Sequence, residues 1–193
     1  MNSSIIKNGQ ISLIIGSMFS GKSSELLRQL NVFSRCYKCI FITHSKDTRN
    51  FLSHNPIIKS DLKDTNITYM KCDDLNSIDI SGFEVIGIDE AQFFNVLKKP
   101  VIKFAKQQKI VIVAGLDSDY NQNVFEEVIS LIPYSTDIKK LSSLCHFCLD
   151  EKSPIINFAP MTVMKKNSEQ KYNDRLIIDN GNIFSVSCIN HMK

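Results

Sequence analysis

The sequence predicts an α/β fold in which a mostly parallel β-sheet is flanked by helices. The first observation is that short apolar runs alternate with helix-like segments as far as Leu141, the pattern of strand–helix–strand units. The second is a glycine-containing segment, Gly16–Ser23, that stands between an apolar run and a helix-like run. The third is a change of character after Leu141, where cysteines cluster. We therefore expect a larger α/β domain, residues 1–141, and a smaller second domain, residues 142–193.

The apolar runs predict five strands and a weaker sixth, because they are short and bounded by polar or turn-forming residues. These runs are Ile11–Ile15, Cys39–Thr43, Ile67–Met70, Glu84–Asp89 and Ile110–Ala114, with the weaker one at Asp137–Leu141. Helical periodicity predicts helices over Lys22–Ser34, Val96–Gln107 and Phe125–Leu131. The segment Lys46–Asp64 is polar and weakly periodic, so we expect a long loop there.

The segment Gly16–Ser23 has the sequence GSMFSGKS and matches the phosphate-binding pattern G-x-x-x-x-G-K-[ST]. Glycines let the backbone curl until successive N–H groups point at phosphate oxygens, and the following helix contributes the positive end of its dipole. Lys22 can reach the β- and γ-phosphates, and the Ser23 hydroxyl can bind Mg²⁺. This P-loop (RecA-like) arrangement predicts that ATP and Mg²⁺ bind at Gly16, Ser17, Met18, Phe19, Ser20, Gly21, Lys22 and Ser23.

A second motif lies at the end of the fourth apolar run, where Asp89 and Glu90 follow Val85–Ile88. Parallel strands bring their carboxyl ends to one edge of the sheet, so both carboxylates are expected beside the phosphate loop. There Asp89 can hold Mg²⁺ through water, and Glu90 can act as a general base toward a phosphoryl acceptor. The alternative is an acidic pair that only caps the next helix.

The composition argues against several classes of protein. The chain has 193 residues, 43% hydrophobic and 22% charged, as in an ordinary globular domain. Its net charge of +3 is weak, and Lys and Arg do not cluster, which argues against a nucleic-acid partner. No apolar run approaches the ~20 residues that span a bilayer, and the first residues do not resemble a signal peptide. We therefore expect no membrane partner and a cytoplasmic location, where disulfides are disfavoured.

Four residues near the C-terminus have the spacing of a zinc site: Cys145 with Cys148, and Cys188 with His191. Three thiolates and one imidazole suit tetrahedral Zn²⁺. Because four protein ligands leave no open position, the spacing predicts a structural metal rather than a catalytic one. His146 is a rival ligand with poorer spacing.

Cys36 and Cys39 also have the C-x-x-C spacing, but no second pair is left to complete a metal site. Cys39 begins an apolar run, so we interpret it as a core residue.

Together these blocks resemble the thymidine kinase family of the zinc-containing type, found in animal cytosol, many bacteria and large DNA viruses. The phosphate loop carries the family's Met-Phe-x-Gly-Lys core. Other blocks that resemble the family's are Lys46–Arg49 (KDTR), Ile88–Phe94 (IDEAQFF), Ala114–Asp117 (AGLD) with Tyr120 and Phe125, and the two zinc pairs. The resemblance extends from about Gly9 to His191, and because only two residues follow His191 it is nearer to viral members, such as those of poxviruses, than to animal ones.

The resemblance implies phosphoryl transfer from ATP to the 5′-hydroxyl of thymidine, giving dTMP for DNA synthesis. Glu90 would be the general base, Lys22 would hold the β- and γ-phosphates, and Arg49 would stabilise charge on the transferring group. The nucleotide–magnesium site would be completed by Asp47, Thr48, Arg49, Asp89 and Gln92. The nucleoside would be bound by Met18, Leu116, Tyr120, Phe125, Arg175, Leu176, Ile177, Ile178, Asp179 and Phe184.

The resemblance also implies that the segment between the zinc pairs is a lasso that covers the nucleoside and binds the base largely through backbone groups. It further implies a homotetramer and feedback inhibition by thymidine triphosphate (dTTP). Three features depart from the family: the lasso is longer, Phe184 stands where tyrosine is frequent, and Asp179-Asn180-Gly181 stands where the family has Gly-Gly. A different class, an ATP-driven nucleic-acid motor with a zinc ribbon, would require the clustered Lys and Arg that the sequence lacks.

Overall fold

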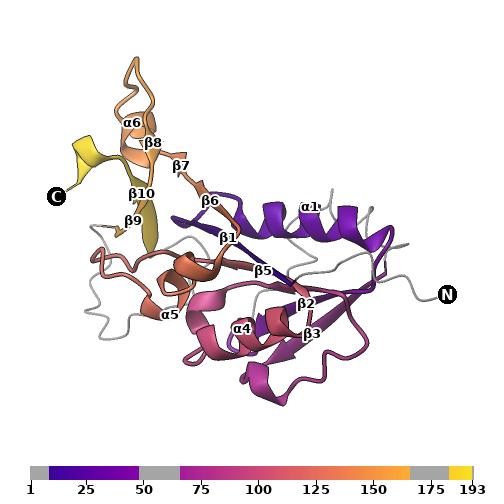
Figure 1. The fold of residues 1–193 in the computed structure, drawn as a ribbon. Helices are drawn as coiled ribbons and strands as arrows, with labels where there is room; N and C mark the ends of the chain where they lie inside the picture. The colour runs from indigo at the N-terminus through magenta and orange to yellow at the C-terminus, as the bar shows by residue number, and fades with distance from the viewer. Residues whose placement is uncertain (1–8, 48–65, 166–182, 193) are drawn as a thin grey trace.

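In the computed structural model, the described residues are 9–47, 66–165 and 183–192 (Figure 1). A six-stranded parallel sheet lies at the centre, with the strand order β3-β2-β4-β5-β1-β6. Its strands are β1 (Gln10–Gly16), β2 (Cys39–His44), β3 (Ile67–Cys72), β4 (Val85–Ile88), β5 (Ile110–Gly115) and β6 (Asp137–Leu141). All six predicted strands are present, which confirms the predicted parallel α/β sheet.

The strand order brings separate motifs to one edge of the sheet. In the register of β1, Ile15 lies opposite Gly115 of β5, and Gly16 lies opposite Leu141 of β6. β4 lies between β2 and β5, so Asp89 follows a central strand. The carboxyl ends of β1, β4 and β5 are therefore neighbours, as in other sheets that bind ligands at this edge.

Helices cover both faces of the sheet (Figure 1). They are α1 (Lys22–Ser34), α4 (Lys98–Lys106) and α5 (Glu126–Ile129), with short 3₁₀ turns η1 (Leu75–Ser77), η2 (Ala91–Phe93) and η3 (Ile132–Tyr134). α1 has the predicted bounds, whereas α5 ends two residues before the end of the predicted helix, and the chain continues through a turn into η3. None of the helices in the described part of the chain is both long and apolar enough to cross a membrane.

The two faces of the sheet bury separate apolar clusters. One face packs against α4 and α5 and contains Val101, Phe104 and Val128. The other packs against α1, whose buried face includes Leu26 and Leu30. Gly87 in β4 permits this close approach, because a Cβ there would lie 2.6 Å from the Leu30 Cδ1 atom. α1 is thereby held directly over β4, the strand that leads to Asp89.

The described residues after β6 form two small antiparallel pairs beyond the carboxyl ends of β1 and β6 (Figure 1). Their elements are β7 (Ser143–Leu144), α6 (His146–Asp150), β8 (Phe158–Ala159), β9 (Met161–Met164), β10 (Phe184–Ser187) and η4 (Ile189–His191). A small cluster of buried residues, among them Cys145, Ala159 and Val186, is separate from the two clusters of the sheet. The division at residue 141 stays a prediction.

Candidate active site

The phosphate loop joins β1 to α1, and glycine is required at both of its ends. Gly16 has a φ of +142°, and a Cβ there would lie 2.0 Å from the Leu141 carbonyl oxygen. Gly21 has a φ of +84°, a conformation that side chains rarely adopt. The Lys22 ammonium donates a 2.6 Å hydrogen bond to the Ser17 carbonyl. The Lys22 side chain is therefore folded back over the loop in which phosphates are expected to bind.

The phosphate loop is also joined to the C-terminal part of the chain. The Ser17 hydroxyl donates to the Ala159 carbonyl at 2.8 Å, and this hydrogen bond is buried. The Met18 N–H donates to the Thr162 hydroxyl at 2.9 Å, and the Met18 side chain packs against the cluster around Cys145. No sequence motif indicated Ala159 or Thr162, because these contacts join residues more than 140 positions apart.

Asp89 lies where the carboxylate motif predicted it, at the sheet edge beside the phosphate loop. It is 2% exposed, and its N–H donates to the Ile42 carbonyl at 2.8 Å. Burial and the charge of Glu90 raise the pKa of the Asp89 carboxyl to about 7, against the hydrogen bond with Ser23 and the charge of Lys22, which lower it. A carboxylate and a hydroxyl in contact are hard oxygen donors, so Ser23 and Asp89 fit a Mg²⁺ ion.

Glu90 has left-handed backbone geometry, with a φ of 51°, and makes no side-chain capping hydrogen bond to η2. The strain of such a conformation is frequent where a side chain is held for function. The Gln92 side chain bridges the site: its Nε2 donates to Glu90 Oε2 at 2.5 Å, and its Oε1 accepts from the Leu116 N–H at 3.0 Å. Gln92 therefore connects Glu90 to the segment predicted to bind the nucleoside. The sequence did not indicate this connecting role of Gln92.

The segment after β5 carries the residues predicted for the nucleoside pocket. Tyr120 and Phe184 stack with ring centroids 5.5 Å apart and an interplanar angle of 28°. Phe125 is 8% exposed and belongs to the sheet core, so its ring packs inside the protein. Leu116 is half-buried beside the same core. Tyr120 and Phe184, two predicted site residues that lie far apart in the sequence, are therefore in contact.

The turn between β5 and α5 is held by its own side chains. The buried Asp119 carboxylate accepts from the main-chain N–H groups of Asn121 and Asn123, each at 2.9 Å. Gln122 then donates from Nε2 to the Thr162 carbonyl at 2.9 Å. The turn that presents Tyr120 is therefore anchored both locally and to β9.

Several predicted residues lie outside the described part of the chain. They are Thr48, Arg49, Arg175, Leu176, Ile177, Ile178 and Asp179. Asp47, the last described residue before the gap, is 3% exposed, and its carbonyl accepts a hydrogen bond from Lys71. The roles of the seven residues outside the described part of the chain stay predictions.

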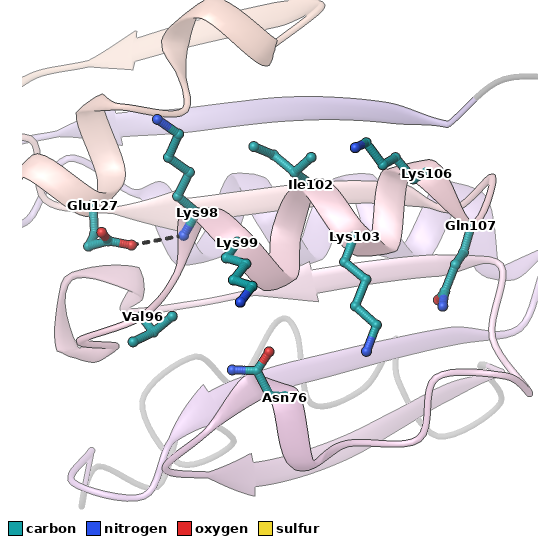
Figure 2. Close-up of a pocket in the computed structure, with 9 residues that line it drawn as sticks. All are labelled: Asn76, Val96, Lys98, Lys99, Ile102, Lys103, Lys106, Gln107 and Glu127. Carbon is teal, nitrogen blue, oxygen red and sulfur yellow. Dashed lines mark hydrogen bonds between the residues drawn. The ribbon is translucent and has the colours of Figure 1, made fainter.

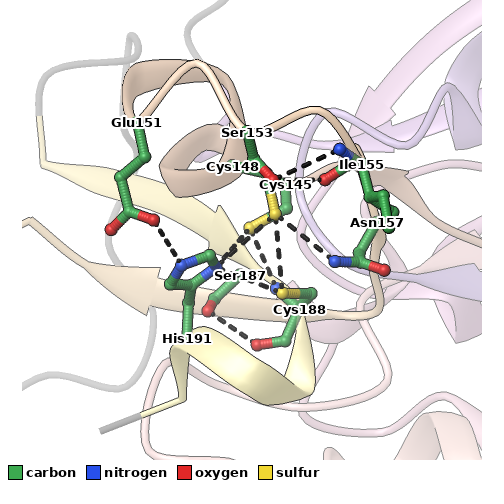
Figure 3. A network of polar contacts seen from close by, with 9 residues as sticks. All are labelled: Cys145, Cys148, Glu151, Ser153, Ile155, Asn157, Ser187, Cys188 and His191. Carbon is green, nitrogen blue, oxygen red and sulfur yellow. Dashed lines mark hydrogen bonds and ion pairs between the residues drawn. The ribbon is translucent and has the colours of Figure 1, made fainter.

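The four predicted zinc ligands converge (Figure 3). The ligand atoms of Cys145, Cys148, Cys188 and His191 all lie within 4.8 Å of one another. The Cys148 and Cys188 sulfurs are 3.9 Å apart, and His191 Nδ1 lies 3.3–3.6 Å from the three sulfurs. Ligands at Zn–S distances of about 2.3 Å in a tetrahedron would place two sulfurs about 3.8 Å apart. The cluster therefore has the dimensions and the chemistry of a closed zinc site.

The surroundings of the cluster favour metal binding. Burial raises the pKa of the Cys145 thiol, but hydrogen bonds from the Cys148 and Cys188 N–H groups and from His191 outweigh burial, and the pKa falls to about 6. A thiolate is the form that binds metal. His191 Nε2 lies 3.0 Å from a Glu151 carboxylate oxygen, as in the carboxylate–histidine pairs that orient metal ligands.

The rival cysteine and histidine candidates are separated from this cluster. His146 is half-exposed and its Nε2 lies 3.2 Å from Asp150 Oδ2. Cys39 is buried, and its thiol contacts the Leu30 carbonyl at 3.8 Å, whereas Cys36 is exposed. The expectation that Cys39 is a core residue is confirmed.

A hollow of about 830 Å³ lies along α4 (Figure 2). Four lysines line it, and the Glu127 carboxylate accepts the N–H groups of Leu97 and Lys98 at 2.8 and 2.9 Å. Its lining residues are Asn76, Val96, Lys98, Lys99, Ile102, Lys103, Lys106, Gln107 and Glu127. The hollow lacks the phosphate loop and the carboxylate pair, so the chemistry of the active site lies elsewhere, at the sheet edge.

A phosphate loop and a buried carboxylate at one edge of a parallel sheet define a P-loop nucleotide-binding protein. A solved structure described as an ATPase domain shares this fold, with a TM-score of 0.51 and 14% identity over 80% of this chain and 76% of that chain. A family model of thymidine kinases matches residues 9–191. The chain belongs to the thymidine kinase family.

Curated relatives agree with this assignment. The chain is 42% identical over 167 residues to the thymidine kinase of Amsacta moorei entomopoxvirus, covering 83% of this chain and 87% of the relative. It is 40% identical over 152 residues to the thymidine kinase of Vaccinia virus (strain Western Reserve), covering 77% and 82%. The predicted resemblance to viral members of the family is thereby confirmed.

Proposed function

We propose that this enzyme transfers the γ-phosphoryl group of ATP to the 5′-hydroxyl of thymidine and releases dTMP and ADP. The observation that carries the proposal is the bridge from Glu90 through Gln92 to Leu116. It joins a carboxylate beside the phosphate loop to the segment that carries Tyr120. A base held between a triphosphate site and a nucleoside pocket is what transfer to a sugar hydroxyl requires.

In the proposed reaction the chain positions the substrates and neutralises charge. The phosphate loop and Lys22 would hold the triphosphate, and Ser23 and Asp89 would hold Mg²⁺, which would supply positive charge beside the transferring group. Glu90 accepts the proton of the 5′-hydroxyl as the oxygen attacks phosphorus. Gln92 orients the Glu90 carboxylate through the 2.5 Å hydrogen bond. Arg49 stabilises the transferring group.

The proposed thymine pocket combines stacking with apolar contacts. Tyr120 supplies aromatic surface, and the buried Phe184 stacks against its ring. Met18 and Leu116 line the space around the 5-methyl group, and Phe125 supports them. Backbone groups of residues 175–179 bind the edge of the base. Zn²⁺ at the Cys3His cluster is structural and holds the segment that carries these groups.

The wider role follows from this reaction. The product, dTMP, supplies DNA synthesis, and dTTP acts as a feedback inhibitor at the same pocket. The active form is a homotetramer in the cytoplasm that requires no nucleic-acid or membrane partner.

The test is a phosphoryl-transfer assay with Mg²⁺–ATP and each of the four deoxynucleosides. We expect thymidine to be phosphorylated at the 5′-position with the highest kcat/KM. Lys22→Ala is the matched control for the phosphate loop and should abolish transfer, because the lysine neutralises phosphate charge. Transfer to none of the four nucleosides by the wild type, or equal rates with Lys22→Ala, would contradict the proposal.

A further inference from the structure

Thr43, the second-last residue of β2, has a buried hydroxyl group that makes no hydrogen bond. The residue is 7% exposed. Among buried side-chain nitrogen and oxygen atoms of the described residues, its Oγ1 is the one that lacks a partner. Buried polar groups nearly always have partners, so an exception calls for an explanation, such as a functional role or a bound water or ion. The position of Thr43 in the sheet indicates which ligand.

The alternation of β2 places the Thr43 side chain on the face covered by α1. Cys39 and Phe41 belong to the cluster that packs against α1, and side chains two residues apart point to the same face of a strand. On the neighbouring strand, Gly87 approaches α1 on that face. Asp89, two residues later, therefore extends from the sheet on the same side as Thr43.

Thr43 and Asp89 are neighbours across adjacent strands. Ile42 lies opposite Ile88, and the Asp89 N–H donates to the Ile42 carbonyl at 2.8 Å. The next residues along the two strands are Thr43 and Asp89, at a strand spacing of about 4.8 Å. The Asp89 carboxyl is hydrogen-bonded to Ser23 in the first turn of α1. Thr43 thus stands one strand beyond the Ser23–Asp89 pair.

The fold itself gives no reason for a hydroxyl at this position. Valine has the same branched shape, is favoured in strands, and would leave no polar atom unpaired. Replacing an unpaired buried hydroxyl by an apolar group of the same shape is expected to be neutral or stabilising. The hydroxyl therefore serves a group that arrives from outside the chain.

We propose that the Thr43 hydroxyl hydrogen-bonds to a water molecule of the Mg²⁺–nucleotide complex at the Ser23–Asp89 pair. Mg²⁺ keeps several of its waters when protein carboxylates and nucleotide phosphates bind it. A neutral hydroxyl can both donate to and accept from such a water. Thr43 is then a positioning residue for the metal, and this inference depends on the nucleotide site of the proposed function but not on the identity of the phosphoryl acceptor.

The experiment compares Thr43→Val with Thr43→Ser, which keeps the hydroxyl. Two quantities are measured: Tm without ligand, and the affinity for a non-hydrolysable ATP analogue with and without Mg²⁺, by calorimetry. We expect Thr43→Val to keep or raise the Tm, by up to about 2–4 °C. We expect it to reduce the gain in affinity that Mg²⁺ provides by about 5- to 10-fold, the size of one lost hydrogen bond, and Thr43→Ser to restore most of that gain.

Two results would overturn the inference. One is a Thr43→Val protein whose Mg²⁺-dependent affinity equals that of the wild type. The other is a clear fall in Tm without ligand, which would mean that the hydroxyl has a structural partner. The thymidine assay of the wild type separates the two proposals: if thymidine is not phosphorylated while Thr43→Val still loses the Mg²⁺ effect, only the proposed function fails.

Discussion

The Ser17 hydroxyl in the phosphate loop donates a buried 2.8 Å hydrogen bond to the Ala159 carbonyl of β8. The Met18 N–H makes a second connection, to the Thr162 hydroxyl of β9. Hydrogen bonds therefore join the phosphate loop to the strands beside the cluster of zinc-ligand residues. A substitution in the phosphate loop is therefore expected to affect the stability of β8 and β9, and a substitution there to affect the loop.

Ser17→Ala tests this connection. The substitution leaves the buried Ala159 carbonyl without its donor, so we expect the free energy of unfolding to fall by about 1–3 kcal/mol. Ser20→Ala is a matched control, because Ser20 is less buried and its hydroxyl bonds only within the loop, to the Ser17 carbonyl. Urea unfolding of both variants measures the difference. Equal destabilisation by the two changes would argue against a special role for the Ser17–Ala159 bond.

Glu90→Gln tests the proposed general base. The amide keeps the shape and an oxygen that can accept the Gln92 hydrogen bond, so binding of ATP and thymidine should be retained. We expect kcat to fall by about 10²–10⁴-fold, because an amide cannot accept the proton. Glu126→Gln, at an exposed position at the start of α5, is the control and should leave kcat unchanged. Wild-type kcat in Glu90→Gln would disprove the assignment.

Cys148→Ser tests the zinc cluster. Loss of one of four ligands should lower the zinc content, measured by elemental analysis, and lower the Tm, because metal binding and folding are coupled at a closed site. We also expect a higher KM for thymidine, since β10, which carries Phe184, ends next to Cys188. His146→Ala removes a neighbouring imidazole that pairs with Asp150 instead and should keep full zinc. A wild-type protein purified without zinc would refute the site.

His44 is expected to make stability depend on pH. Its ring packs edge-on against Phe94 at 4.9 Å, and its Nδ1 accepts the Lys46 N–H at 3.0 Å. Burial lowers the pKa of His44 from 6.5, with the charge of Asp73 raising it and that of Lys46 lowering it further. His44 therefore binds a proton less tightly in the folded protein than in the unfolded chain. This contribution to stability is complete above pH 6.5 and is lost as the pH falls through the lower pKa of the folded state.

His44→Asn keeps an acceptor for the Lys46 N–H and does not titrate. The free energy of unfolding, measured between pH 7 and pH 5, should therefore decline less steeply in this variant than in the wild type. If the slopes of the wild type and His44→Asn coincide, His44 does not cause the dependence.

The sequence predicted the sheet and the local motifs well, for physical reasons. Strands such as Ile110–Gly115 are buried at every residue and therefore appear as continuous apolar runs. The phosphate loop and the zinc ligands have fixed spacing, which sequence alone displays. The ends of helices were predicted less closely: α5 spans Glu126–Ile129 within the predicted segment Phe125–Leu131, because an apolar pattern does not mark the last hydrogen-bonded turn.

Contacts between distant side chains could not be predicted. Gln92 reaches Leu116, and Ser17 reaches Ala159, only because the strand order brings their elements together. The same holds for Thr43, whose missing partner is visible only when every neighbouring group is placed. No spacing in the sequence encodes such pairs.

The place of β1 between β5 and β6 also has a consequence during synthesis on the ribosome. β1 leaves the ribosome first, yet both of its partners, β5 and β6, are encoded much later. At about 5–20 residues per second, the apolar strand waits roughly 5–20 s for the first of them. During that time its unpaired backbone and side chains can associate with other chains. Chaperone binding to the nascent N-terminal segment would therefore protect the yield of this protein more than its final stability.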